Sequence, residues 1–345
     1  MLTMYIVLDG LDFGAGIIFL FVAKNEKDKE GIIKSIGPFW DGNEVWLIAG
    51  GGVMFAVFPT LYASAFSGLY LPLMLVLWML IFRGIGLELR HLVDNKLWKQ
   101  VWGAAFGLSS LMLALLFGIA LGNIVRGVNL GGVENGILAY NPVYFFTPLW
   151  SNDFSPLNNH PGVIDWFTII LGAIAVISLT IHGANWVIFK TNLSIAIRLK
   201  KISFQLSVAL VLMMIISFIA WLIVKPNAFD NFIVNPIFWL APVAVFVGLV
   251  GMLRVNSYKK DITAFLFSSL FIIGSFVSTL LALFPVFIPS TNDIVPDLTI
   301  YNTAATQYGM SVALGWWIPA IILVGGYFYN LHRTFRGKLD DVEYH

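Results

Sequence analysis

Two pairs of carboxylates lie inside segments that are otherwise apolar. Asp9 and Asp12 belong to the N-terminal run MYIVLDGLDFGAGIIFLF, and Asp41 and Glu44 stand in the string WDGNEVW at the start of the next run. In each pair the residues are three apart, which places both carboxylates on one face of a helix. Neighbouring carboxylates in a medium of low dielectric constant repel each other, so protonation of at least one of them is favoured. The two pairs could therefore take up and pass on protons.

The same pairs also have structural interpretations. Asp9 and Asp12 can bond to neighbouring helix ends or pair with Arg83. Asp41 and Glu44 stand in the first turn of a helix, where acidic residues complement the helix dipole, and D-x-x-E resembles a capping box. Because a polar cluster between two tryptophans is more than a cap requires, the sequence favours a proton-handling role for Asp41. The structural interpretation stays open for both pairs.

Arg83 and His182 are two further polar residues expected inside apolar runs. A buried cation requires a carboxylate partner, and Asp12, Asp41 and Glu44 are candidates for a structural ion pair with Arg83. His182 is the one histidine of five that falls deep in a run. It could ligate a haem or relay a proton, but several haems would need several ligands, so a hydrogen-bonded core histidine is favoured.

The composition excludes several other kinds of site. The chain has no cysteine, which excludes disulfides, thiolate metal sites and a cysteine nucleophile. No nucleotide-binding loop, zinc motif or nucleophile elbow occurs. A net charge of +1 excludes the basic face that nucleic-acid binding needs. The residues therefore predict no metal and no cofactor bound by this chain, and no nucleic-acid partner.

The elements that must position these residues are transmembrane helices. Hydrophobic residues make up 59% of the 345 residues and charged residues only 11%, whereas a soluble domain carries about 25% charged residues. Spanning helices need about 20 apolar residues each. We predict a single all-α membrane domain over residues 1–345 with about nine spans: Leu2–Ala23, Phe39–Leu61, Ala65–Leu87, Val101–Val125, Val163–Phe189, Ile202–Val224, Pro236–Leu253, Ile262–Phe287 and Gly309–Leu331.

The basic residues predict the orientation of these spans. Seventeen of the 20 Lys and Arg residues fall in alternate connecting segments: Lys24–Lys34, Arg90–Lys99, Lys190–Lys201, Arg254–Lys260 and Arg333–Lys338. Cytoplasmic loops are enriched in Lys and Arg, so these segments are expected inside, with the N-terminus outside and the C-terminus inside. The longest connection, about residues 126–162, is then external, and a short tail, about residues 332–345, is cytoplasmic. The first run lacks the basic start of a cleavable signal peptide.

Several strings in the first quarter of the chain resemble one family. They are VLDGLDFGAG from Val7, SIGPFWDGNEVWL from Ser35, FAVFP from Phe55 and FRG from Phe82, with weaker agreement at HGA, FSS and FP further on. In these motifs the chain is similar to subunit II of the cytochrome bd quinol oxidases. The family's nine spans and its orientation agree with those predicted from the charges.

The resemblance implies a division of labour. Subunit I binds haems b and d and oxidises quinol, while subunit II ligates no haem and packs against it, sometimes with a very small third subunit. Membrane lipid and quinone are further expected partners, in a bacterial or archaeal plasma membrane. The complex reduces oxygen to water with protons taken from the cytoplasm. The aspartate of W-D-G-N, here Asp41, would lie on the proton path, and Asp9 and Asp12 match the family's first acidic pair.

One departure and two competing hypotheses remain. Family members usually carry a longer segment before D-G-x-D, whereas Met1 lies only eight residues before Asp9, so a misassigned start is expected. A proton-coupled secondary transporter could use Asp9, Asp12 and Asp41 as coupling carboxylates, although no inverted repeat is evident. A scaffold whose buried charges only fix subunit packing is the third hypothesis.

Overall fold

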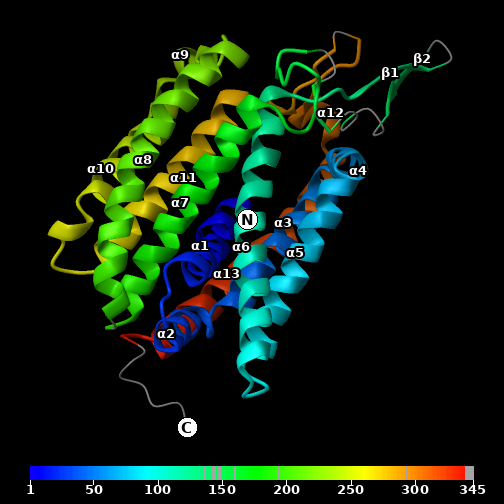
Figure 1. Cartoon of the computed structure of the whole chain (residues 1–345). Helices are drawn as coiled ribbons and strands as arrows, with labels where there is room; N and C mark the ends of the chain where they lie inside the picture. The colour runs from blue at the N-terminus through cyan, green and yellow to red at the C-terminus, as the bar shows by residue number, and fades with distance from the viewer. Residues whose placement is uncertain are drawn as a thin grey trace.

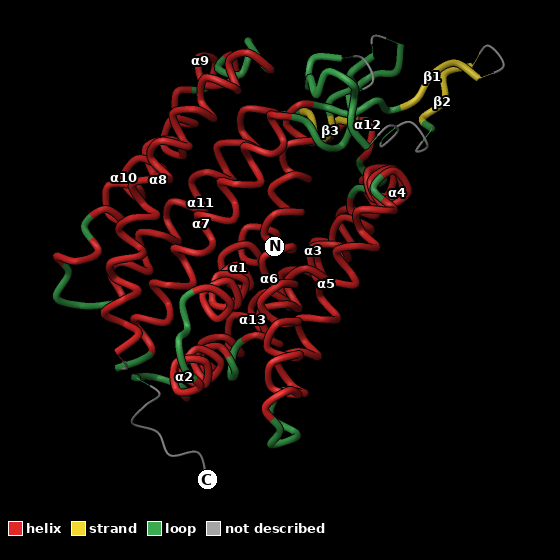
Figure 2. The backbone as a smooth tube through the Cα atoms, in the orientation of Figure 1, coloured by secondary structure: helices red, strands yellow, loops and turns green. Residues whose placement is uncertain are grey.

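The structure, a computed structural model, describes residues 1–134, 137–141, 145, 149–158, 161–192, 194–292 and 294–338. These residues form a bundle of helices with a few short strands at one end (Figure 2). The helices are α1 (Leu2–Phe21), α2 (Glu26–Ile36), α3 (Trp40–Val57), α4 (Pro59–Gly68), α5 (Tyr70–Leu89), α6 (Lys96–Arg126), α7 (Trp166–Lys190), α8 (Ser194–Val224), α9 (Asp230–Val234), α10 (Leu240–Leu253), α11 (Ile262–Leu283), α12 (Ile300–Thr303) and α13 (Gln307–Thr334). Strand β1 (Gly131–Glu134) pairs antiparallel with β2 (Ile137–Tyr140), and β3 (Val286–Ile288) with β4 (Leu298–Thr299).

Eight helices in the described part of the chain are long and apolar enough to cross a membrane. They are α1, α5, α6, α7, α8, α10 with the short 3-10 turn before it, α11 and α13. Helix α3 has 18 residues but opens with the polar sequence WDGNE, which keeps it out of this group. The prediction of a helical multi-pass membrane protein is confirmed. The count of nine spans and their orientation stay predictions.

The second and third predicted spans differ from the helices observed. Helix α3 ends at Val57, and a separate helix, α4, begins at Pro59. Because proline lacks the N–H that would continue the α3 ladder, the chain turns between the two helices. Helix α4 thus contains the end of the predicted second span and the start of the third, and α5 begins only at Tyr70.

Helix α2 lies in a connection for which the sequence analysis predicted no helix. Asn25 caps its first turn by accepting a hydrogen bond from the backbone N–H of Asp28. The side chains of Ile32, Ile33 and Ile36 are buried against the bundle. The segment was overlooked because its many charges conceal the apolar face that these isoleucines form.

Helix α1 lies at the centre of the bundle, and α13 lies at its edge. Helix α1 packs against α3, α6, α7 and α11, whereas α13 contacts chiefly α3 and buries none of its residues fully. Figure 1 shows α8 and α10 on one side of α1 and α3, α4 and α5 on the other. Helices α1 and α7 cross at Gly14 and Gly183, where a Cβ atom on either residue would collide with the opposite backbone. These two glycines therefore allow the close approach of the two helices.

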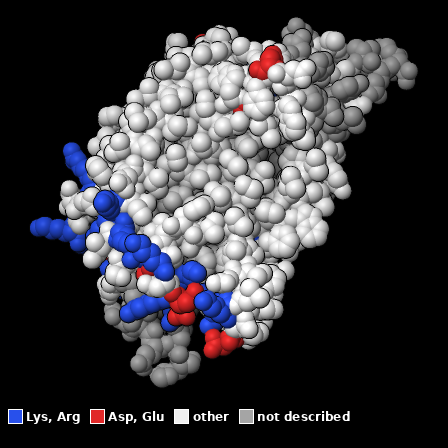
Figure 3. Space-filling view, viewed as in Figure 1, with Lys and Arg blue, Asp and Glu red and all other residues white. Residues whose placement is uncertain are grey.

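Most Lys and Arg side chains on the visible face gather at one end of the bundle, where α2 lies; we call it the basic end. Lys and Arg side chains cluster there on the visible face, and the rest of that face is almost free of them (Figure 3). The strand pairs and α12 lie at the opposite end (Figure 2). The predicted external connection, about residues 126–162, includes β1 and β2, but part of it lies outside the described residues. The predicted tail is described only to residue 338.

Candidate functional site

Arg83 of α5 is the centre of a buried charge cluster. Its Nη1 donates to Asp9 Oδ1 at 2.6 Å and its Nη2 donates to Glu44 Oε2 at 2.8 Å. The guanidinium also lies over the ring of Phe13, with Cζ 4.9 Å from the centroid. One side chain thus ties α5 to α1 and to α3. Of the partners considered from the sequence, Glu44 and Asp9 contact Arg83.

Asp12 lies in the same polar region but has a different partner. Its Oδ2 accepts a hydrogen bond of 2.9 Å from Asn43 Nδ2 of α3. Both Asp9 and Asp12 are fully buried, and they lie on one face of α1, as their spacing predicted. Asn43 was not among the site residues predicted from the sequence. The spacing of Asn43, Trp46 and Gly50, the three buried residues of α3, could have identified it as part of the inward face.

Several buried polar atoms of this region have no hydrogen-bond partner within the described protein. They are Tyr5 Oη, Asp9 Oδ2, Asp12 Oδ1, Asn43 Oδ1, Trp46 Nε1 and Arg83 Nε. They belong to the facing stripes of α1 and α3 and to the arginine between them. Buried polar groups of this kind are commonly satisfied by ordered water. The interior between α1 and α3 is therefore a polar seam within an otherwise apolar bundle.

The charges of the cluster do not balance. Asp9, Asp12 and Glu44 provide three carboxylates, while Arg83 provides one positive charge. Asp9, Asp12 and Arg83 are almost completely buried, and the Glu44 side chain is 25% exposed. In a medium of low dielectric constant, a net charge of this size favours the uptake of protons.

Asp41 lies outside this cluster. It is exposed in the first turn of α3, and no hydrogen bond or ion pair joins it to another described residue. The N-cap of α3 is Phe39, and no side-chain cap bond is formed there. The capping-box interpretation of Asp41 and Glu44 is therefore wrong, because Asp41 follows the cap by two positions and Glu44 binds Arg83 instead.

His182 is a hydrogen-bonded core residue. Its Nδ1 lies 2.8 Å from Ser268 Oγ on α11, and its Nε2 lies 2.9 Å from the carbonyl oxygen of Val7 on α1. The imidazole stacks on the ring of Phe265, with centroids 4.7 Å apart. Since both ring nitrogens are engaged, neither offers a free lone pair to a metal. Among the described residues, no group of three or more His, Asp or Glu side chains is placed to hold a metal ion.

A second buried ion pair lies at the end opposite the basic end. Arg126, the last residue of α6, contacts Asp165, the N-cap of α7, and also donates to the carbonyl oxygen of Gly162 at 2.8 Å. The Asp165 carboxylate accepts from the backbone N–H of Thr168. The sequence analysis placed Arg126 in the external connection. The structure gives it a structural role in joining α6 to α7.

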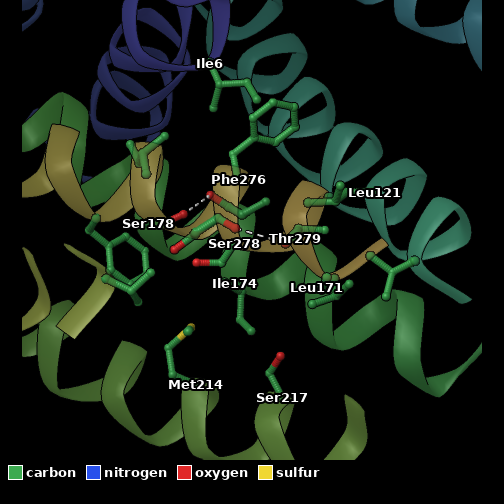
Figure 4. Close-up of a pocket in the computed structure, with 18 of the residues that line it drawn as sticks. Ile6, Leu121, Leu171, Ile174, Ser178, Met214, Ser217, Phe276, Ser278 and Thr279 are labelled. Atoms are coloured by element: carbon green, nitrogen blue, oxygen red, sulfur yellow. Dashed lines mark hydrogen bonds between the residues drawn. The ribbon is translucent and has the colours of Figure 1, made fainter. Parts of the chain in front are cut away.

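An apolar cavity of about 540 Å³ lies beside the charge cluster, between α1, α6, α7, α8 and α11 (Figure 4). Tyr5 and Phe13 of α1 line one wall. Ser178 and Thr279 also line it, and their hydroxyls donate to backbone carbonyls of their own helices, whereas the buried hydroxyls of Ser275 and Ser278 have no partner among the described residues. The lining is otherwise mostly apolar and carries no charged side chain, so it suits a hydrocarbon chain better than a charged substrate.

Comparison with known proteins identifies the family. The family described as cytochrome bd terminal oxidase subunit II matches residues 1–335. The chain belongs to this family. It is 28% identical to the cytochrome bd-I ubiquinol oxidase subunit 2 of Escherichia coli, with 93% of this chain and 86% of the relative covered. It is also 28% identical to the cytochrome bd ubiquinol oxidase subunit 2 of Bacillus subtilis, covering 98% of this chain and 94% of the relative.

A solved structure agrees in fold. The bd oxidase from Geobacillus thermodenitrificans superposes with a TM-score of 0.71 at 19% identity, over 97% of this chain and 94% of that one. At this identity the likeness concerns the fold alone. As a member of the cytochrome bd subunit II family, the chain is a multi-pass plasma-membrane subunit of a respiratory terminal oxidase, and its place in that complex implies a partner subunit I.

Proposed function

We propose that this chain is the haem-free subunit of a quinol-oxidising, oxygen-reducing complex, and that its carboxylates handle protons for the reduction of oxygen to water. The observation that carries the proposal is the excess of carboxylates around Arg83. Three carboxylates and one guanidinium approach neutrality only when protons are held between them. A buried group of this kind can accept and release a proton at little structural cost.

The four carboxylates take three different roles in this proposal. Asp9 and Glu44 hold Arg83 and thereby fix α1, α3 and α5 relative to one another. Asp41, exposed in the first turn of α3, collects protons. Asp12, whose one hydrogen-bond partner among the described residues is the neutral Asn43, exchanges them inside the bundle. The accumulation of Lys and Arg at the basic end supports a cytoplasmic position for that end, and hence proton entry at Asp41 from the cytoplasm.

The haem-free role has support from the chain's own residues. Both nitrogens of His182 are engaged in hydrogen bonds, and the described residues contain no other cluster suited to a metal. We therefore propose that haems b and d, which supply the redox chemistry when bound, are held by subunit I. The quinol that donates electrons would be oxidised there as well.

The surface formed by α3, α5 and α13 is the proposed docking face for subunit I. On α3, Ile48 and Phe55 are largely exposed, and nothing lies within 4 Å of a Cβ added at Gly51 or Gly52. Helix α13 buries none of its residues fully in this chain. Glycines on an apolar face allow a neighbouring helix to approach closely. A partner made of transmembrane helices fits such a face.

The other proposed partners are a membrane lipid or quinone and a third subunit. The apolar cavity beside α1 suits the hydrocarbon chain of a lipid or quinone. A very small third subunit is the remaining proposed partner. The transporter hypothesis has no support left, because the chain belongs to a terminal-oxidase family. A purely structural role remains the competing interpretation of the carboxylates.

The test is the turnover of the complete complex with single carboxylates neutralised. Asp41→Asn keeps a polar side chain in the first turn of α3, so stability should change by less than about 1 kcal/mol. Quinol oxidase turnover should fall by about 10²-fold if proton transfer is lost. Asp94→Asn is the matched control, because Asp94 is an exposed carboxylate at the basic end, paired only with Lys99. Full turnover of an assembled Asp41→Asn complex across pH would refute the proton-handling role.

A further inference from the structure

Lys190, the last residue of α7, occupies an unusual site for a lysine. It is almost completely buried, and no carboxylate among the described residues pairs with it. Its ammonium instead lies over three aromatic rings, 5.0 Å from the centroid of Phe39, 5.2 Å from that of Trp186 and 5.3 Å from that of Phe189. A buried cation without a counter-ion is costly, and ring faces offset part of this cost.

The same ammonium binds the end of another helix. Lys190 Nζ donates to the carbonyl oxygen of Phe335 at 2.7 Å, and Phe335 is the C-cap of α13. The negative ends of two helix dipoles, those of α7 and α13, therefore meet at one positive charge. The last carbonyl groups of a helix have no partner within the helix, and here a lysine satisfies one of them.

Other contacts also hold the C-terminal end of α13 near Lys190. The ring of Phe39 lies 5.1 Å from His332 and 5.9 Å from Phe335, both at the end of α13. Lys338 adds a second connection, because its Nζ donates to the carbonyl oxygen of Thr191 and to Asp261 Oδ2, each at 3.1 Å. Most of α13 is exposed, and its other packing in this chain comes from partly buried side chains such as Ile321, Val324 and Phe328, so these contacts add to a limited attachment.

We propose that Lys190 is a positioning residue that fixes the basic end of α13 to α7 and so builds the proposed docking face of α3, α5 and α13. The opposite end of α13 is joined to α3 by a backbone bond from Ala305 N to Val57 O, 2.8 Å long, just before the helix begins. Between these two points α13 has no fully buried residue. Loss of the lysine would free one end of the helix. The inference that this affects binding of subunit I rests on the proposed docking face.

Hydrogen exchange in the purified two-subunit complex tests the proposal. Lys190→Met keeps the length of the side chain but removes the charge and the donor. A hydrogen bond from a charged group contributes about 1.5–3 kcal/mol, so amides near residues 331–338 should exchange about tenfold faster or more. Lys190→Arg keeps both charge and donor, and exchange should stay close to that of the unmodified complex. Lys201→Met is the matched control, because Lys201 is exposed at the same end.

Two outcomes would overturn the proposal. Unchanged exchange at the end of α13 in Lys190→Met, or an equal increase in Lys201→Met, would show that Lys190 does not hold the helix. If the Met variant yields no complex, Lys190→Gln, which keeps a donor but loses the charge, gives the same measurement with a smaller expected increase. Retention of subunit I is scored separately. Faster exchange with subunit I fully retained would keep the role of Lys190 in holding α13 and refute docking on that helix.

Discussion

Replacing Arg83 by Gln should destabilise the complex strongly. The substitution leaves Asp9 fully buried and Glu44 three-quarters buried with no cation within contact distance. Removing one partner of a buried ion pair costs about 3–5 kcal/mol. Loss of the contact between the guanidinium and the Phe13 ring adds about 0.5–2 kcal/mol. We expect a total loss of stability near the upper end of the range of about 3–5 kcal/mol given for the ion pair. Proton uptake by the carboxylates would reduce this loss.

A matched control is available at the C-terminal end of the same helix. Arg90, the C-cap of α5, is as buried as Arg83, but its partner Glu26 is 53% exposed. Partial burial works against ionisation of Glu26, yet Arg90 and Lys29 lower its pKa on balance. A carboxylate left beside water after Arg90→Gln stays solvated. The expected cost is therefore only about 1 kcal/mol for the ion pair itself.

The measurement is unfolding of the purified complex in a denaturing-detergent titration, followed by circular dichroism. Adding Asp9→Asn to the Arg83→Gln variant removes the uncompensated charge and should recover part of the loss. The coupling between the two positions follows from the double-mutant cycle. Equal destabilisation by Arg83→Gln and Arg90→Gln, or a further loss on adding Asp9→Asn, would refute the view that the cluster depends on its guanidinium.

Asp12→Asn should leave assembly intact and lower oxidase turnover, measured with quinol in reconstituted vesicles; normal turnover would make that carboxylate structural. His182→Gln should keep the full reduced-minus-oxidised haem spectrum, and loss of one haem band would mean that this chain ligates iron. A cytoplasm-only fluorescent reporter fused to the C-terminus should be bright, whereas a dark fusion at normal protein levels would reverse the orientation. Partial burial raises the pKa of Asp261, but Lys200 and Lys338 lower it on balance. A carboxyl group whose pKa is lowered in the folded state stabilises that state above the ordinary pKa range of Asp, and this contribution is lost only as the pH falls below that range. Asp261→Asn should therefore destabilise the end of α13 equally at pH 6 and pH 8, as measured by hydrogen exchange.

Composition and residue spacing were enough to predict the membrane environment of this protein and the positions of its unusual residues. Low charge and long apolar runs leave a bilayer as the environment, because these properties are local and additive along the chain. The spacing of Asp9 and Asp12 placed both on one helical face, as observed. The motifs around Asp41 indicated the family that the comparisons confirm. Deep burial of His182 followed from its place in an apolar run.

Which of these residues contact one another depends on how the helices pack. Arg83 contacts Asp9, 74 positions away, and Glu44, 39 positions away, while exposed Asp41 remains apart. The Lys190 contact with Phe335 joins residues 145 positions apart. Periodicity gives the direction of each side chain about its own helix axis. It does not give the neighbouring helix or the depth at which two helices cross, because these depend on glycine contacts and ring packing contributed by the whole bundle.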